Sequence, residues 1–262
     1  MDLEKIKNAP DGSITDMKTI KEITKYCIDN RNITLAIKID VNHTYGGLYP
    51  HGVERGPEPE LTEDYILSEL GVTGDVLAIY PYGSQVYGTA GPDSDHDFII
   101  VMKSAILDNG AFRNNAITNE DGTIQGVVYS RGGFIDAINN YEIGALECLS
   151  LDSNDVVLSK WPFKMNNWNE KKMVSRVIMK ASNSRHTADQ QSKNGNKVIG
   201  RRGMFHALRI LNFGLQLKEH KKIVDFSVCN DLYEEMKLVE PDEFDTRDYY
   251  EEFDKLLVKL RK

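Results

Sequence analysis

The stretch YPYGSQVYGTAGPDSDHDFIIVM, residues 80–102, constrains the fold of this chain more than any other part of it. It places a glycine-serine pair and a second glycine after one apolar run, and the sequence Ser-Asp-His-Asp at the start of the next. Short apolar runs bounded by glycine are typical of buried strands. The stretch therefore predicts strands at 75–82 and 97–102, and the second must begin with two aspartates whose charge needs an offset.

Asp95 and Asp97 are separated by one residue, so in a strand their side chains point to the same side. Two neighbouring carboxylates disfavour joint ionisation unless a cation offsets their charge. Hard oxygen ligands on a short, rigid segment suit Mg²⁺ or Mn²⁺. We therefore expect Asp95 and Asp97 to be metal ligands; the alternative is a solvated turn that leads into a strand.

Gly83 and Ser84 are suited to holding a phosphate group. A glycine lets the backbone approach a phosphate closely, the N–H groups after it can point at the ligand, and the Ser84 hydroxyl is a further donor. Gly88 indicates that a short turn or helix begins at Gly83. Taken alone, each of these residues is also common in ordinary turns.

The combination is more specific than its parts. From residue 83 to 97 the chain reads GSQVYG, TAGPD and SDHD in succession, and an apolar strand follows. This order resembles the signature of the DNA polymerase beta-like nucleotidyltransferase superfamily, and within it the small predicted nucleotidyltransferases of bacteria and their phages. The resemblance implies an α+β fold, in which a small mixed sheet with flanking helices is followed by a C-terminal helical region.

The resemblance also implies a Mg²⁺-dependent reaction in which an acceptor hydroxyl attacks the α-phosphate of a nucleoside triphosphate such as ATP, and pyrophosphate leaves. Gly83, Ser84 and Ser94 would bind the nucleotide. Asp95 and Asp97 would be both metal ligands and catalytic residues. The base and the acceptor stay open, because the motif describes only the donor side: tRNA ends, other RNA, a protein hydroxyl and a small hydroxylated molecule are all compatible.

A third carboxylate, which the superfamily normally supplies from a nearby strand, is missing at its expected place. The strand predicted at 124–130 has Gln125 there, and an amide can coordinate a cation but cannot take a proton. Glu120 and Asp121 would substitute if the register were shifted, or they form an ordinary turn. Glu147 is either catalytic or paired with an arginine of the C-terminal half. The open alternative is a nucleotide-binding module that has lost catalysis and acts through protein or RNA contacts.

The segment RRGMFHALRILNFGLQL, from residue 201, resembles a helix of the same family that bears a His-x-x-Arg element. Arg202, His206 and Arg209 lie on one face of this helix by their spacing. We expect them to contact the triphosphate or an acceptor phosphate. The alternative is that His206 and Arg209 pair with carboxylates across the domain interface.

Charge is segregated along the chain, although the formal net charge is -8. Residues 171–218 contain eleven lysines and arginines against one acid, and acids dominate from 231 to 254. Such runs usually mark solvated helix faces, and the basic segment also makes an anionic ligand plausible. The acidic end would, in a weaker third hypothesis, dock on a basic partner.

The remaining patterns divide the chain near residue 160. We predict a nucleotidyltransferase α/β domain with an N-terminal extension at 1–160 and a helical C-terminal domain at 161–262. Periodicity predicts helices at 14–31, 61–70, 134–140, 144–151, 170–190, 198–220, 230–238 and 246–261, strands at 33–41 and 124–130, and an irregular loop at 43–59. Three distant cysteines and the lack of a long apolar run predict a cytoplasmic protein with no membrane partner.

Overall fold

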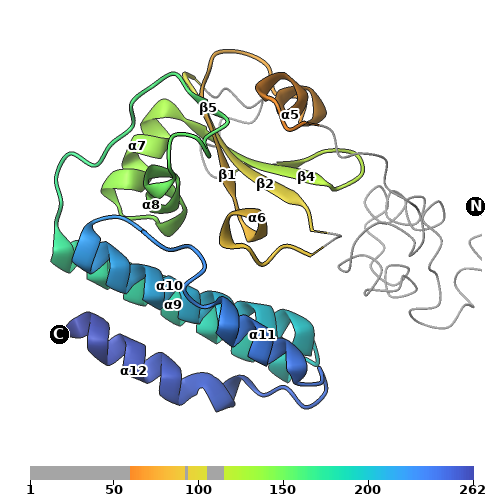
Figure 1. Ribbon diagram of the computed structural model, residues 1–262, viewed down its shortest axis with the longest axis vertical. Helices are drawn as coiled ribbons and strands as arrows, with labels where there is room; N and C mark the ends of the chain where they lie inside the picture. The colour runs from red at the N-terminus through yellow and green to blue at the C-terminus, as the bar shows by residue number, and fades with distance from the viewer. Residues whose placement is uncertain (1–59, 92–93, 105–114) are drawn as a thin grey trace, which may run out of the picture. The chain divides into compact units, whose positions relative to one another are not determined.

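The computed structural model describes residues 60–91, 94–104 and 115–262. The helix, strand and loop predicted before residue 60 lie outside the described residues. Contacts divide the chain into two compact units, residues 1–59 with 91–95, and residues 60–90 with 96–262. The helices and strands labelled in Figure 1 belong to the second unit, which is described here by itself.

A five-stranded mixed sheet is the centre of the α/β part of this unit, within the described residues (Figure 1). Its strands are β1 (Val76–Tyr82), β2 (His96–Met102), β3 (Asn115–Thr118), β4 (Ile124–Ser130) and β5 (Leu158–Ser159). They lie in the order β3-β4-β2-β1-β5; β2 and β4 are parallel, and every other neighbouring pair is antiparallel. The predicted α+β class and the strands predicted at 75–82, 97–102 and 124–130 are confirmed.

Helices cover both faces of the sheet (Figure 1). They are α5 (Glu63–Glu69), α7 (Arg131–Asn139) and α8 (Ile143–Ser150), while the short α6 (Ser84–Tyr87) follows β1. Alternate residues of β2 belong to two apolar clusters: Phe98 and Ile100 pack with α5, and Ile99 and Val101 pack with α7 and α8. The helix predicted at 61–70 is confirmed as α5, and its N-cap Thr62 accepts a hydrogen bond from the Tyr65 N–H.

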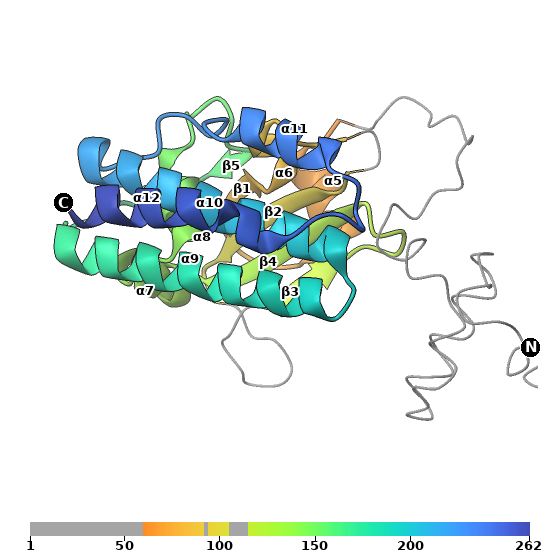
Figure 2. The same cartoon turned by 90° about the horizontal axis from the view of Figure 1, so that it is seen from below.

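The C-terminal part of the unit is helical, as predicted. It comprises α9 (Glu170–Lys193), α10 (Lys197–His220), α11 (Asn230–Leu238), the 3-10 helix η1 (Thr246–Tyr249) and α12 (Tyr250–Arg261). Figure 2 shows α9, α10 and α12 side by side. Their apolar cluster also takes in Tyr87 of α6 and Leu146 of α8, so these two helices of the α/β part pack on α10. The domain boundary near residue 160 stays a prediction.

Two further features of the described residues bear on the expectations from composition. None of their helices is long and apolar enough to cross a membrane. Cys148 and Cys229 are buried free thiols.

The contact between α9 and α10 depends on Gly214. A Cβ at this position would lie 2.5 Å from Cγ1 of Val177 and 3.2 Å from Cδ2 of Leu260. Gly214→Ala is therefore expected to destabilise the fold by about 1–3 kcal/mol through overpacking, although alanine is the better helix former. Gly132→Ala is the control, because a Cβ there meets nothing within 4 Å.

Unfolding in denaturant measures both variants. Gly132→Ala should leave the free energy of unfolding unchanged or raise it by up to about 1 kcal/mol. A Gly214→Ala protein as stable as the Gly132→Ala protein would contradict the packing described here.

Candidate functional site

A row of four side chains crosses one end of the sheet. The strand register pairs Asp97 of β2 with Tyr82 of β1 on one side and with Gln125 of β4 on the other, and Gln125 in turn with Thr118 of β3. Directly paired residues point to the same face of a sheet. Asp97, Gln125 and Tyr82 are half-buried, so the row is accessible yet fixed by its strands.

Gly83 approaches the Asp97 carboxylate more closely than any other residue type could. Its φ of 78° is in the region that favours glycine, and a Cβ at this position would collide with Oδ2 of Asp97. Gly83 is also the N-cap of α6, which runs from Ser84 to Tyr87, and the C-cap Gly88 again has positive φ. The structure thus brings Gly83, Ser84 and Asp97 together.

The acids considered as substitutes for a third carboxylate lie in the turn between β3 and β4. Oδ1 of Asp121 accepts hydrogen bonds from the N–H and the hydroxyl of Thr123, at 3.0 and 2.6 Å, which fixes the turn. The resulting register places Gln125 beside Asp97. Within the described ranges, no group of three or more His, Cys, Asp or Glu side chains could hold a metal ion.

Ser94 and Asp95 belong to the first compact unit. The Ser94 hydroxyl accepts a hydrogen bond from the Gly91 N–H at 2.8 Å, and the Ser94 N–H donates to the Gly91 carbonyl at 3.0 Å. Ser94 is therefore part of a local turn. The roles of Ser94 and Asp95 in binding nucleotide and metal stay predictions.

Glu147 lies in a buried polar network that joins α6, α8 and α10. Its side chain is 3% exposed, and Oε2 accepts a hydrogen bond of 2.6 Å from the Tyr87 hydroxyl. The Arg209 guanidinium lies over the Tyr87 ring, 3.5 Å from the ring centroid. Nη2 of Arg209 donates to Nδ1 of His206 at 3.0 Å, since an arginine has no acceptor. Tyr87 thus lies between the carboxylate and the guanidinium.

Burial controls the protonation of this network. It raises the pKa of Glu147 to about 7, against the Tyr87 hydrogen bond and the positive charges of Arg209 and Lys180. Burial, together with the positive charges of Arg209 and Lys180, lowers the pKa of His206 to about 3. His206 is therefore neutral at pH 7, which agrees with its acceptor role towards Arg209.

The three residues predicted on the basic helix are placed differently from one another. All lie on α10, where Arg202 is exposed, His206 is half-buried and Arg209 is 8% exposed. The structure joins His206 and Arg209 but leaves Arg202 at the surface. Their contact with phosphate stays a prediction.

Two residues of this region escaped the sequence analysis. Tyr87 was not distinguished from other aromatic residues near the motif, and Lys180 was only one of many lysines in the basic segment. Lys180 lies on α9, and its charge acts on both Glu147 and His206. Only the packing of α9 and α10 against α6 and α8 distinguishes these two residues from their neighbours.

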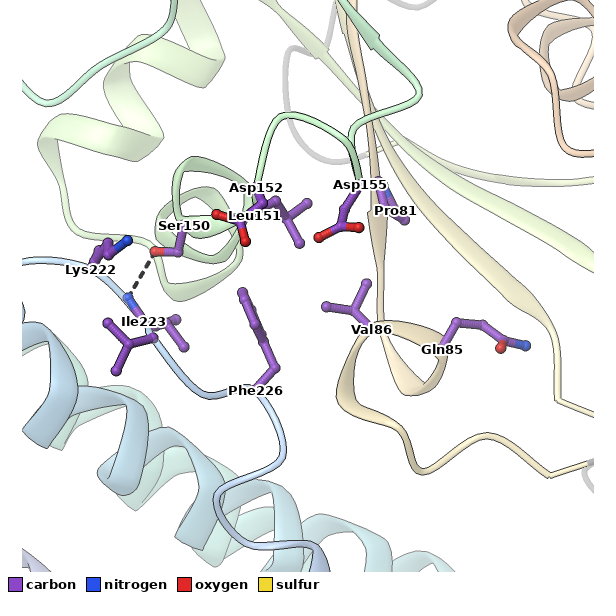
Figure 3. Close-up of a pocket in the computed structure, with 11 residues that line it drawn as sticks. Pro81, Gln85, Val86, Ser150, Leu151, Asp152, Asp155, Lys222, Ile223 and Phe226 are labelled. Carbon is purple, nitrogen blue, oxygen red and sulfur yellow. Dashed lines mark hydrogen bonds between the residues drawn. The ribbon is translucent and has the colours of Figure 1, made fainter.

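A pocket of about 480 Å³ lies next to α6 (Figure 3). Asp152 and Asp155 point into it from the segment after α8, and the ring of Phe226 lies across from them. The Ser150 hydroxyl accepts the Ile223 N–H at 2.9 Å and so ties the end of α8 to the segment after α10. The residues predicted to bind metal or nucleotide do not line this pocket.

Glu147 and His206 are expected to give opposite pH dependences of the free energy of unfolding. The pKa of Glu147 rises from 4.5 to about 7 on folding, so the native state binds more protons in that window and stability falls as pH rises. The pKa of His206 falls from 6.5 to about 3, so the unfolded state binds more protons and stability rises with pH. The two effects oppose each other between pH 4.5 and 6.5.

Single variants separate the two effects. Glu147→Gln should leave a free energy of unfolding that increases with pH, and His206→Gln should leave one that decreases, each by up to about 1.4 kcal/mol per pH unit. Denaturant titrations across this window measure the slopes. Parallel pH profiles for the wild type and both variants would contradict the burial of these groups.

Part of the chain is similar to a known protein family. Residues 64–147 match the family model of the nucleotidyltransferase domain, a segment that runs from α5 into α8. No curated protein matches the chain. A solved structure that is similar to it is a nucleotidyltransferase-like protein from Exiguobacterium sibiricum 255-15, at 13% identity and a TM-score of 0.27, with 76% of this chain and 71% of that chain covered. The match of residues 64–147 to this family model confirms the resemblance seen in the Gly-Ser and Ser-Asp-x-Asp sequences.

Proposed function

We propose that this protein transfers a nucleoside monophosphate from a nucleoside triphosphate to a hydroxyl acceptor and releases pyrophosphate. The observation that carries the proposal is the contact of the Gly83-Ser84 turn with Asp97, inside the segment that matches the nucleotidyltransferase domain. A backbone that can approach phosphate thereby lies beside a carboxylate that can hold its counter-ion.

Asp95 and Asp97 would hold Mg²⁺ or Mn²⁺. For Asp97 the support is its place beside Gln125, because carboxylate and amide oxygens are hard donors that fit these cations. For Asp95 the support is the sequence, in which it stands two residues before Asp97. When bound, the cation would supply charge neutralisation for the phosphates and the departing pyrophosphate.

The chain's own residues would mainly position the reacting groups. Gly83 and Ser84 would hold the outer phosphates through backbone N–H groups and a hydroxyl, with Ser94 as a further donor. Arg202 and Arg209 would contribute positive charge from α10. His206 would act as a neutral hydrogen-bonding group, because its pKa is about 3.

The acceptor hydroxyl must lose its proton when it attacks the α-phosphate. Gln125 cannot accept this proton, because an amide is not a base at neutral pH. In the row of four paired side chains at the end of the sheet, Asp97 is the residue with a carboxylate. It would take the proton directly or through water.

A second function is favoured by the same glutamine. With an amide at the position paired with Asp97, the domain would bind a triphosphate without turning it over and act through ligand-dependent contacts with a protein or RNA. The acceptor under the leading proposal stays open among RNA, including tRNA ends, protein and small hydroxylated molecules. The cytoplasmic location, with no membrane partner, also stays a prediction.

Replacing both predicted metal ligands tests the leading proposal. Asp95→Ala combined with Asp97→Ala is expected to reduce transfer by at least about 100-fold, the loss seen when one group that stabilises a transition state is removed. Transfer is measured with four labelled triphosphates against total RNA and total protein. Asp136→Ala, which changes an exposed acid of α7, is the matched control and should keep full activity. Full transfer by the double variant would make the mechanism wrong.

Introducing an acid at residue 125 separates the two functions. If the wild-type protein binds triphosphate in calorimetry but releases no pyrophosphate, and Gln125→Asp or Gln125→Glu begins to release it, the binding module is the right description. Thr118→Asp is the control, since it adds an acid to the same row one strand further from Asp97. Turnover by the wild-type protein supports the transferase.

A further inference from the structure

Helix α6 depends on contacts with other elements for its position. It has four residues, which is too short to be stable without tertiary contacts. Gly83 before it and Gly88 after it both have positive φ, at 78° and 71°. Glycine restricts the backbone conformation less than any other residue, so neither end of α6 is fixed by its own sequence. The position of the Gly83-Ser84 turn therefore depends on what the side chains of α6 contact.

Tyr87 provides these contacts. The residue is 3% exposed, and its side chain and main chain together are held from three other helices. The hydroxyl donates to Glu147 of α8 at 2.6 Å, the ring lies under the guanidinium of Arg209 of α10 at 3.5 Å, and the main-chain carbonyl accepts from Nδ2 of Asn230 of α11 at 2.8 Å. Figure 1 shows α6 between the sheet and α10. Two of these three helices belong to the C-terminal helical part.

The hydrogen bond between Tyr87 and Glu147 is not needed to fill space in the core. Glu147 stands in the apolar sequence ALECLSL, and a buried carboxylate costs free energy that a leucine at the same place would not. A hydrogen bond of 2.6 Å between a hydroxyl and a carboxylate is strong and directional. It fixes the orientation of the Tyr87 ring, and with it the helix that follows the Gly83-Ser84 turn.

We propose that Tyr87 and Glu147 are positioning residues, which together with Arg209 hold α6 so that the Gly83-Ser84 turn lies against Asp97 and can receive the triphosphate. This inference rests on the proposed function. Neither Tyr87 nor Glu147 needs to touch the nucleotide. Through them, the C-terminal helices determine how well the phosphate-binding turn is formed.

Tyr87→Phe is the main test, because it removes only the hydroxyl and keeps the ring under Arg209. Affinity is measured by calorimetry, first for the preferred triphosphate with Mg²⁺ and then for the matching nucleoside. The triphosphate affinity should weaken by about 10-fold, as it does when residues that support a binding group are removed, and the nucleoside affinity should stay unchanged. The difference arises because the turn holds phosphates and not the base. Equal loss for both ligands, or no loss for either, would overturn the inference.

Tyr141→Phe is the matched control. Tyr141 is also 3% exposed, lies in the same apolar cluster and uses its hydroxyl twice, as donor to the Asn167 carbonyl and as acceptor from the Asn169 N–H. It has no contact with α6 among those described. Its loss should lower the melting temperature but leave the triphosphate affinity unchanged; a triphosphate-specific loss equal to that of Tyr87→Phe would show a merely structural effect.

Two variants at residue 147 separate positioning from stability. Glu147→Gln keeps an acceptor for the Tyr87 hydroxyl, so its triphosphate affinity should stay within about 2-fold of the wild type. Glu147→Leu has no acceptor and should weaken the affinity as Tyr87→Phe does. The double variant Tyr87→Phe with Glu147→Leu removes both sides of this hydrogen bond and should weaken triphosphate affinity as much as Tyr87→Phe does. Wild-type triphosphate affinity in the double variant would overturn the inference.

Hydrogen exchange without nucleotide tests the positioning of α6 independently of the proposed function. The Tyr87 N–H donates to Gly83 and the Thr89 N–H donates to Ser84, so both amides report on α6. They should exchange at least about 10-fold faster in Tyr87→Phe than in Tyr141→Phe. Unchanged exchange overturns the inference even if the wild type binds triphosphate. Failure of the wild type to bind any triphosphate, with faster exchange in Tyr87→Phe, rejects the proposed function and retains the positioning of α6.

Discussion

The approach of the Asp97 carboxylate to the Cα of Gly83 is the contact on which the site depends. It requires a residue without a Cβ, with φ of 78°, at the end of a strand whose last residue pairs with Asp97. The antiparallel pairing of β1 and β2 places Gly83 next to Asp97. The parallel pairing of β2 with β4 holds the strand of Asp97 from its other edge. The apolar clusters on both faces of the sheet keep these strands in register, because a slip of one residue would turn Asp97 into the core.

The buried network behind α6 shows why a fold tolerates an expensive group. Tyr87 separates Glu147 from Arg209, and it offers a hydrogen bond to the first and its ring face to the second. Each charge is thereby compensated without a direct contact between them. Lys180 adds positive charge from α9, and the neutral His206 accepts from Arg209 without adding more. Such an arrangement favours one geometry over others that would bury the same apolar area.

Local patterns were sufficient to predict much of the structure. Apolar runs and the turn residues beside them predicted the strands at 75–82, 97–102 and 124–130, and Thr118 and Gln125 flank the turn that contains Glu120 and Asp121. Strands β3 and β5, of four and two residues, are too short for a periodic pattern. Spacing also predicted that His206 and Arg209 share a face. It could not predict that this face meets Tyr87, because such a contact depends on how distant helices pack.

The apolar cluster that α6 and α8 share with α10 determines how far the chain can be divided. Tyr87, Ile143 and Leu146 are buried against residues of the C-terminal helices, such as Phe213. A fragment ending near residue 160 would present these three side chains to water and would remove the Arg209 charge that acts on the carboxylate of Glu147. Residues 64–147, which match the family model, thus share a buried cluster with the C-terminal helices. Insertions would be tolerated best in surface loops that leave this cluster closed.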